Sequence, residues 1–395
     1  MDFHFTPQEE TFRHELRSWL AHNLPADYDP DKFAWEMGGE ERFRFHLAWH
    51  KQLHAGGWVG IHWPQAYGGR GATLIEQLIF HEELARARAP HPANVLGLIM
   101  AGPVIMHWGT EGQKERYLPK ILSAEELWCE GLSEPGAGSD LASLQTRAAD
   151  DGDYFVVNGQ KVWTSWAHRA RFCQLFVRTD PDAPKHKGMA CLLVDMQTPG
   201  ITVRPLVQIT GDAEFSEVFF DNVRVPKTNL LGAKDQGWQV LVTTLMFERS
   251  GIGFDLPVDT TLQQLIALAR RVQIDGRPAS ADPAVRQKLA QFSTECKAIR
   301  YNVLRHLTRR LQGNPPGPEG SVGKLAGSEV GLKMAALATE LLGAYAPLTG
   351  ESPYALEQGR WARVALGARA LTIAGGTSEV QRNIVGERVL GLPKG

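Results

Sequence analysis

The sequence has few cysteines and no spacing typical of metal ligands. Of its 395 residues only four are cysteine, and none of them stands in a C-x-x-C pair: Cys129, Cys173, Cys191 and Cys296. The histidines form no H-E-x-x-H motif, and we interpret the four-residue spacing of His46 and His50 as incidental. These absences argue against a zinc site and a disulfide framework. We expect four reduced, mostly buried thiols in a cytosolic protein, and no bound metal.

The chain also lacks an excess of charge and a long apolar run. The formal net charge is −2, so a basic surface for nucleic acid or anionic lipid is not indicated. The longest apolar stretch, residues 95–106, is broken by Gly102 and Pro103. It is shorter than the about 20 residues that a membrane helix needs. The first residues lack a basic segment followed by an apolar one. We therefore expect no signal peptide, no membrane span and a cytoplasmic location.

Residues 1–124 show the periodicity of helices. The run Thr6-Pro7-Gln8-Glu9 is a capping box with proline at the first helical position. The residues between 58 and 71 are rich in glycine, tryptophan and proline, and we predict a connecting loop there. Further helices are predicted at residues 40–55, 74–87, 94–108 and 113–121.

Residues 125–231 change to the shorter period of strands. Two strand-like runs, residues 154–157 and 161–163, flank Asn158-Gly159. Because Asn-Gly is typical of a type I′ turn, this pattern predicts a hairpin. Further strands are predicted at residues 172–178, 189–195, 201–205 and 217–225. Short strands at this spacing favour a small β-barrel or sandwich.

Residues 232–395 are helical again. Pro315 and Pro316 interrupt the pattern. The run from Ser378 to Gln381 reads as a second capping box. Helices are predicted at residues 236–249, 261–272, 283–311, 321–343, 353–370 and 378–390. The fold class is therefore a multidomain α+β protein: an N-terminal helical domain, a middle β-barrel or sandwich domain and a C-terminal helical bundle.

The segment Glu134-Pro135-Gly136-Ala137-Gly138-Ser139-Asp140, at the start of the β region, resembles a motif of the acyl-CoA dehydrogenase family. Segments 109–119, 158–165, 215–226 and 376–384 resemble further parts of that family, in the family's order. The resemblance implies that FAD oxidises an acyl-CoA thioester to a 2-enoyl-CoA. A carboxylate takes the α-proton and hydride passes to flavin N5. It also implies an electron-transfer flavoprotein or similar acceptor, and a homodimer or homotetramer.

The resemblance assigns cofactor contacts to two groups of residues. In the β region, Leu132 and Ser133 would contact the flavin ring, and Gly138, which has no Cβ, would let the backbone approach the cofactor closely. Ser139 would lie between the flavin and the pantetheine arm of the substrate. Trp163 would pack on the isoalloxazine and Ser165 would hydrogen-bond near N5, since residues two apart on a strand share a face.

The second group lies in the C-terminal region. Thr377 and Glu379 would contact the ribityl or pyrophosphate part of FAD, near the start of a helix. Gly343 belongs to a segment that, in the family, touches the adenosine of a neighbouring subunit's flavin.

The base is displaced from the position that much of the family uses. Many members carry glutamate where this chain has Gly375, which has no side chain but keeps a backbone N–H for the thioester oxygen. Branched-chain, isovaleryl-type members carry a glutamate-arginine pair on the first long helix of the third domain. The matching residues here are Glu248 and Arg249, so Glu248 is the candidate base and Arg249 its neighbour at the substrate.

One family motif is missing, and two other functions stay open. Relatives commonly carry R-x-x-F-G where this chain reads from Arg270 to Pro278 without Phe-Gly; Arg270, Arg271 or Arg277 could substitute. One alternative is a flavin monooxygenase of the same fold. The other is a catalytically silent subunit that completes a partner's flavin site, suggested by Gly375. The acyl group is not determined by these motifs.

Overall fold

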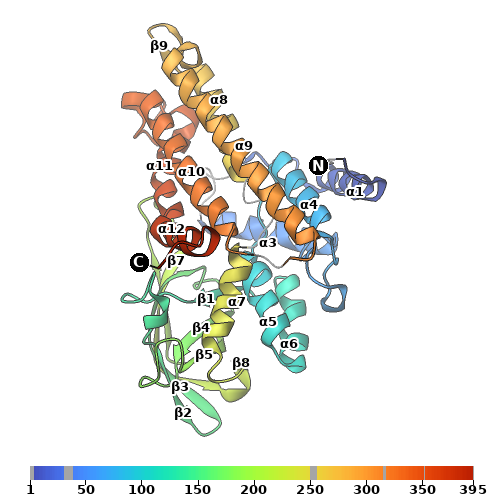
Figure 1. The fold of residues 1–395 in the computed structure, drawn as a ribbon, viewed down its shortest axis with the longest axis vertical. Coiled ribbons are helices and arrows are strands. Elements are labelled where there is room, and N and C mark those ends of the chain that lie inside the picture. Colours follow the sequence, from blue (N-terminus) through green and yellow to red (C-terminus); the bar gives the residue numbers. More distant parts are fainter. Residues whose placement is uncertain (1–3, 31–38, 250–255, 315–316, 351, 395) are drawn as a thin grey trace. The chain divides into compact units, whose positions relative to one another are not determined.

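The computed structural model describes residues 4–30, 39–249, 256–314, 317–350 and 352–394 (Figure 1). The chain divides into two compact units. The sheet unit comprises Gly39–Ala72 and Pro90–Glu248. The bundle unit comprises Met1–Gly38, Thr73–Ala89 and Arg249–Gly395.

The sheet unit is built on one eight-stranded sheet among the described residues. The strand order is β6-β7-β3-β2-β4-β5-β8, and β1 pairs in parallel with β4. Its inner face is an apolar cluster that includes Phe155, Leu175 and Val194. The strands are β1 (Trp128–Gly131), β2 (Arg147–Asp151), β3 (Tyr154–Ser165), β4 (Phe172–Arg178), β5 (Met189–Asp195), β6 (Ile201–Leu206), β7 (Phe215–Pro226) and β8 (Leu230–Leu231). The four strands predicted after residue 170 are thus confirmed.

The predicted hairpin at Asn158-Gly159 was wrong, because β3 runs through both residues without turning. The turn lies earlier, at Gly152, which has φ 60° and joins β2 to β3. Gly159 instead sits at an irregularity in the pairing of β3 with β7. A Cβ on Gly159 would lie 2.7 Å from the Cα of Thr146, so glycine is required there by close backbone approach.

Along the chain, the helices of the sheet unit both precede and follow the strands. They are α3 (Gly39–Ala55), α5 (Gly102–Trp108), α6 (Glu111–Leu122) and α7 (Gly237–Arg249). The helix predicted at residues 94–108 is present from residue 95, and it contains a π-helical turn at Gly97–Ala101 directly before α5. The predicted loop between 58 and 71 contains a 3₁₀ turn, Gln65–Tyr67. Trp63 in that loop is fully buried, and its indole N–H donates to the Leu98 carbonyl at 3.0 Å, so the loop contributes to the core.

The bundle unit packs long helices around a second apolar core, which includes Leu265, Met334 and Trp361. Figure 1 shows α9, the longest of these helices, beside α8 and α10. The helices are α1 (Pro7–Asn23), α4 (Leu74–Arg86), α8 (Leu256–Arg271), α9 (Pro283–Leu311), α10 (Gly320–Leu342), α11 (Arg360–Leu371) and α12 (Ser378–Ile384). The capping box at Thr6 is confirmed. Among the described residues, every helix is too short or too polar to span a bilayer.

Two predictions for the bundle unit need correction. The predicted helix at 353–370 begins only at Arg360, after a 3₁₀ turn in which Glu357 and Gln358 have positive φ angles of 50° and 55°. The run without Phe-Gly forms a small hairpin, β9 (Gln273–Ile274) and β10 (Arg277–Pro278), since Asp275 and Gly276 supply the two positive φ angles of its turn.

The second correction concerns the last predicted helix. Its N-cap is Thr377 and not Ser378, and α12 passes at Ile384 into a π-helical turn, Val385–Val389. The predicted capping box fails because Gln381 does not bond back to the helix start. Its side-chain amide donates to the Gly375 carbonyl at 2.8 Å instead.

Candidate active site

The loop after β1 is a tight turn held from within. The N–H of Glu134 donates to the carbonyl of Ala137, and the N–H of Ala137 donates back, each at 3.0 Å. The Glu134 carboxylate points inward and accepts from the N–H groups of Gln145 and Thr146 at 2.6 and 2.9 Å. Because Glu134 anchors the turn, the residues that follow remain open to a ligand: Pro135, Gly136, Gly138 and Ser139 are all exposed.

A buried lysine on β3 completes this anchor. Lys161 is fully buried, and its ammonium group donates to the Glu134 carboxylate at 2.8 Å and to the Leu132 carbonyl at 2.9 Å. Burial opposes ionisation of Glu134, but Lys161 and the bonds from Thr146 and Gln145 hold the pKa of this carboxyl below its ordinary value. Sequence reasoning missed this pair, although a lysine inside an otherwise strand-like run was a visible signal.

An exposed tryptophan stands beside this loop. The N–H of Val162 donates to the Ser133 carbonyl at 2.9 Å, which ties the loop to β3. The next residue, Trp163, has φ 60° at a shift of register, and 59% of it is exposed. Its ring meets Phe215 edge-on, with centroids 6.0 Å apart. A strained backbone that presents a large aromatic ring to solvent is typical of a ligand-binding surface. Ser165, two residues on, is half-buried.

A groove lies against the same loop. Its volume is about 390 Å³, within the range of small-molecule sites. Its walls come from the turn and from the neighbouring strands: Glu134, Pro135, Gly136, Ser143, Gln145, Thr146, Gly159 and Gln160. The bulge at Gly159 therefore shapes one wall of the groove.

The bundle unit contains the second group of predicted site residues, around Gly375. Gly375 and Gly376 both have positive φ, 63° and 89°. Lys324 on α10 donates to the Gly376 carbonyl at 2.7 Å, and Gln381 donates to the Gly375 carbonyl at 2.8 Å. These two side chains hold the carbonyl groups and so orient the peptide units that follow them, with the N–H groups of Gly376 and Thr377. The N–H of Gly375 belongs to the peptide unit before them.

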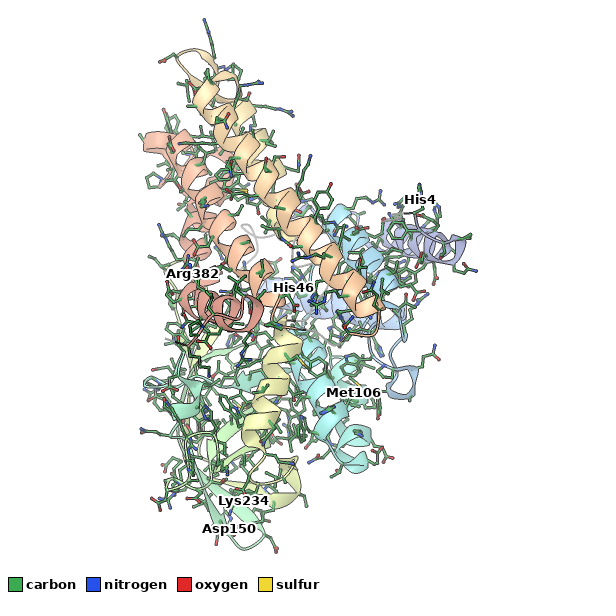
Figure 2. All side chains as sticks on the ribbon, viewed as in Figure 1. His4, His46, Met106, Asp150, Lys234 and Arg382 are labelled. Atoms are coloured by element: carbon green, nitrogen blue, oxygen red, sulfur yellow. The ribbon has the colours of Figure 1, made fainter. Side chains whose placement is uncertain are left out.

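Thr377 has a structural task in this turn. Its hydroxyl caps α12 by accepting from the Val380 N–H at 3.2 Å. Ser378 donates to Glu329 on α10 at 2.7 Å, and Arg382, labelled in Figure 2, donates to the same carboxylate at 3.2 Å. Glu379 projects outward, with 78% of its side chain exposed. The start of α12 is thus fixed to α10.

Gly343 lies apart from this turn within the bundle unit. It ends α10 with φ 53°, fourteen residues beyond Glu329. At 1.5 Å per residue, that distance is roughly 21 Å along the helix. The structure therefore brings Gly375, Thr377 and Glu379 together without Gly343.

Glu248 lies in the last turn of α7, in the sheet unit, and is half-buried. Thr244, one turn earlier, is fully buried and accepts from the Gln174 amide at 2.9 Å. The backbone of Arg249 ends the helix, and its side chain lies outside the described residues. The sheet unit thus contains Glu248 and the flavin-contact residues predicted for the β region.

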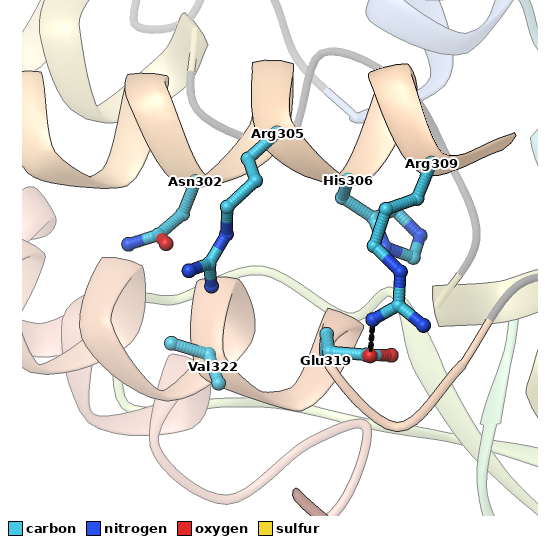
Figure 3. A pocket seen from close by; sticks show the side chains of 6 residues that line it. All are labelled: Asn302, Arg305, His306, Arg309, Glu319 and Val322. Atoms are coloured by element: carbon cyan, nitrogen blue, oxygen red, sulfur yellow. Dashed lines mark hydrogen bonds and ion pairs between the residues drawn. The ribbon is translucent and has the colours of Figure 1, made fainter. Parts of the chain in front are cut away.

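A second hollow, between α9 and α10, is too small for an acyl thioester. Figure 3 shows Arg305 and Arg309 of α9 above Glu319 and Val322. Arg309 is paired with Glu319. The hollow holds about 30 Å³, room for little more than a water molecule.

Three family models match the chain in succession. They describe the N-terminal domain of acyl-CoA dehydrogenase at residues 6–125, the middle domain at 129–223 and the C-terminal domain at 235–390. The chain belongs to the acyl-CoA dehydrogenase family. Members of this family carry out FAD-dependent dehydrogenation of acyl-CoA. The resemblance, the fold class and the assignment as an oxidoreductase of lipid metabolism are confirmed, while the domain boundaries at residues 124 and 231 stay predictions.

Individual members of the family are similar to this chain over nearly its full length. Acyl-CoA dehydrogenase IpdE1 of Mycobacterium tuberculosis is 41% identical over 391 residues, which cover 98% of each protein. The crystal structure of the ChsE4-ChsE5 complex from Mycobacterium tuberculosis matches with a TM-score of 0.86 at 34% identity, covering 100% of both chains. A structure described as the Tcur3481-Tcur3483 steroid ACAD matches with the same TM-score at 33% identity, again over 100% of both chains.

Proposed function

We propose that the chain removes the α- and β-hydrogens of an acyl-CoA thioester, with Glu248 as the base that takes the α-proton. The observation that carries this proposal is the carboxylate of Glu248, half-buried in the last turn of α7. Gly375 has no side chain to abstract a proton, so the base has to come from elsewhere. A half-buried carboxylate can contact a ligand. It is also partly shielded from water, which favours its protonated form and so makes it a stronger base.

The surface around Trp163 fits the isoalloxazine of FAD. The indole of Trp163 is exposed, although burial would be favourable for so large a ring. A side chain that stacks on a planar ligand has to be exposed in this way before the ligand binds. Leu132, Ser133 and Ser165 would hold the ring from the loop and the strand. When bound, FAD supplies the acceptor for the two electrons and the β-hydrogen. The anchor of Lys161 and Glu134 keeps this surface in place.

The thioester oxygen needs a donor, because an α-proton is otherwise too weakly acidic to be removed. We propose the N–H of Gly375 for this role, since Lys324 and Gln381 hold the two peptide units that directly follow it and so restrain the turn in which it lies. Ser139, exposed on the loop after β1, would contact the pantetheine arm. Thr377 and Glu379 would contact the FAD chain beyond the ring, through the backbone at the start of α12.

For the acyl group, we propose a steroid-derived thioester. The support is that a solved relative covering the whole chain is described as a steroid ACAD. Two solved relatives are each described by two protein names: the ChsE4-ChsE5 complex and Tcur3481-Tcur3483. We therefore propose an oligomer, either of identical chains or with a second member of the family. An electron-transfer flavoprotein or similar acceptor would reoxidise the flavin.

The test is anaerobic flavin bleaching by a panel of acyl-CoA thioesters, steroid-derived and linear. Glu248→Gln should retain FAD but bleach about 10²- to 10⁴-fold more slowly than the wild type, because a general base contributes that much. Glu125→Gln, an exposed glutamate of the same unit, is the matched control and should bleach at the wild-type rate. Wild-type bleaching by Glu248→Gln would show that the base is another group. Failure of the FAD-loaded wild type to bleach with any thioester would favour the silent-subunit alternative.

A further inference from the structure

Glu130 on β1 is a buried carboxyl group that the proposed reaction does not use. It is 6% exposed, and neither carboxyl oxygen has a hydrogen-bond partner among the described residues. An unpaired carboxylate is so poorly solvated in such a place that the group retains its proton instead. Glu130 is therefore a neutral acid with an O–H that can be donated.

A chain of polar residues leads from Glu130 to α7. Glu130 stands opposite Gln174 in the parallel pairing of β1 and β4. The Gln174 amide donates to the Thr244 hydroxyl at 2.9 Å, and both residues are fully buried. Thr244 and Glu248 are four residues apart on α7, so their side chains are neighbours on one helix face. These four residues form a polar cluster between the sheet and the helix that carries the candidate base.

Burial and the neighbouring groups all raise the pKa of Glu130. Burial raises the pKa of Glu130 well above its ordinary value, and the Cys173 thiol and the Glu248 carboxylate raise it further. On β5, Cys191 has a thiol pKa that burial raises well above the ordinary value. On β3, Lys161 is engaged by Glu134. The π-helical turn at Gly97–Ala101 carries no titratable side chain. The charge on Glu248 thus helps to hold the proton on Glu130.

We propose that Glu130 is a positioning residue for Glu248: a buried carboxyl group that stays neutral beside the charged candidate base. This inference rests on the proposed function, in which Glu248 is the base. Before reaction, Glu248 carries the charge and Glu130 the proton. The α-proton then moves to Glu248 while the electron pair of the C–H bond stays with the substrate. Glu130 keeps its own proton throughout, and its presence adjusts how strongly Glu248 binds the incoming one.

Infrared difference spectroscopy tests this directly, because a protonated carboxyl group has a C=O stretching band that a carboxylate lacks. We expect such a band in the wild-type holoenzyme at pH 7 and its absence in Glu130→Gln. In Glu248→Gln the band should disappear at a lower pH than in the wild type, because the charge that helps Glu130 to retain its proton is gone. The wild-type bleaching rate should change over the pH interval in which the band is lost, and the rate of Glu130→Gln should not.

Two results would overturn the inference. In the first, the wild type and Glu130→Gln have the same spectrum at pH 7 in the region of the protonated carboxyl band. In the second, the band titrates at the same pH in the wild type and in Glu248→Gln. The second comparison remains available if Glu130→Gln fails to fold. A Glu248→Gln protein that bleaches normally, yet shifts the titration of the band, would refute Glu248 as the base and leave the coupled pair standing. Failure of the pair and failure of the proposed function are thus distinguishable.

Discussion

Lys161 and Glu134 form an ion pair of 2.8 Å beneath the loop that presents the candidate flavin surface. The side chain of Lys161 is 0% exposed and that of Glu134 is 8% exposed. Such a pair is not a large net source of stability, because both ions lose their hydration. Its importance is geometric: Lys161 also bonds the Leu132 carbonyl, so one ammonium group ties the backbone before Ser133 to the side chain of Glu134 after it.

Removing one partner of this pair should be far more harmful than removing an exposed lysine. We expect Lys161→Met to lower the free energy of unfolding by about 3–5 kcal/mol, because it leaves Glu134 buried with an uncompensated charge. Lys227→Met is the matched control, since Lys227 pairs with Asp150 where both side chains are substantially exposed and should cost at most about 1 kcal/mol. Denaturant unfolding of both variants measures the difference. A Lys161→Met/Glu134→Gln double variant as unstable as Lys161→Met would contradict this account.

The glycine at the β3 irregularity should be intolerant of any side chain. In Gly159→Ala the new Cβ would lie 2.7 Å from the Thr146 Cα, which belongs to the backbone and cannot move aside cheaply. Gly152→Ala is the control: it also has positive φ, 60°, but a Cβ there has nothing within 4 Å. We expect about 1 kcal/mol of destabilisation for Gly152→Ala and clearly more for Gly159→Ala. Equal melting temperatures of the two variants would rule out the close approach.

The turn at Gly375 should depend on Lys324 for its orientation. Lys324→Met removes the donor to the Gly376 carbonyl and should slow flavin bleaching several-fold with little change in bound FAD, if the Gly375 N–H serves the thioester oxygen. Lys333→Met, an exposed lysine on the same helix, serves as the control. Stopped-flow bleaching and the FAD content of both proteins are the measurements. An unchanged bleaching rate in Lys324→Met would mean that the turn keeps its orientation without this bond.

Acid should destabilise the sheet unit through His50. This side chain is fully buried, its Nε2–H donates to the Leu122 carbonyl at 2.8 Å, and its Nδ1 accepts from the Asn94 N–H at 3.4 Å. Burial lowers its pKa from 6.5 to about 4. The unfolded chain therefore binds a proton that the folded chain refuses, and stability present above pH 6.5 falls as the pH drops toward 4, by about 3 kcal/mol.

Unfolding free energies measured at several pH values check this expectation. His50→Gln should reduce but not abolish the dependence between pH 6.5 and 4, because burial also lowers the pKa of His62 to about 4; the variant will be less stable at neutral pH. His107→Gln, which replaces an exposed histidine of the same unit, should leave the dependence as it is. If His50→Gln shows the full wild-type acid dependence, another group is responsible.

Local patterns predicted most of the helices and strands, since each element carries its own period. The boundaries of α9, Pro283 to Leu311, follow directly from a proline at its start and the breaker beyond its end. The Asn158-Gly159 pattern misled because the same dipeptide suits a turn or an irregular strand. Pairing with β7 favours the strand over the turn, because the backbone N–H of Asn222 on β7 donates to the Asn158 side chain at 2.9 Å. A residue 64 positions away cannot be seen in a local window.

The candidate site also contains residues that local motifs predicted and residues that only the tertiary structure revealed. Motifs placed Trp163 and Ser165 on a strand and Gly375 in a turn, but the supporting residues were invisible to motif reasoning. Lys324 reaches Gly376 across 52 residues, and only packing of α10 against the C-terminal segment makes that bond.

The sequence by itself determined the family, the order of helical and strand regions and the candidate base Glu248, because these depend on residue types at short, fixed spacings. The tertiary structure alone decided that Lys161 anchors Glu134 and that Glu130 is buried near Glu248. The physical reason is solvation. Whether a charged side chain is paired, neutral or exposed depends on which distant strands and helices exclude water from it.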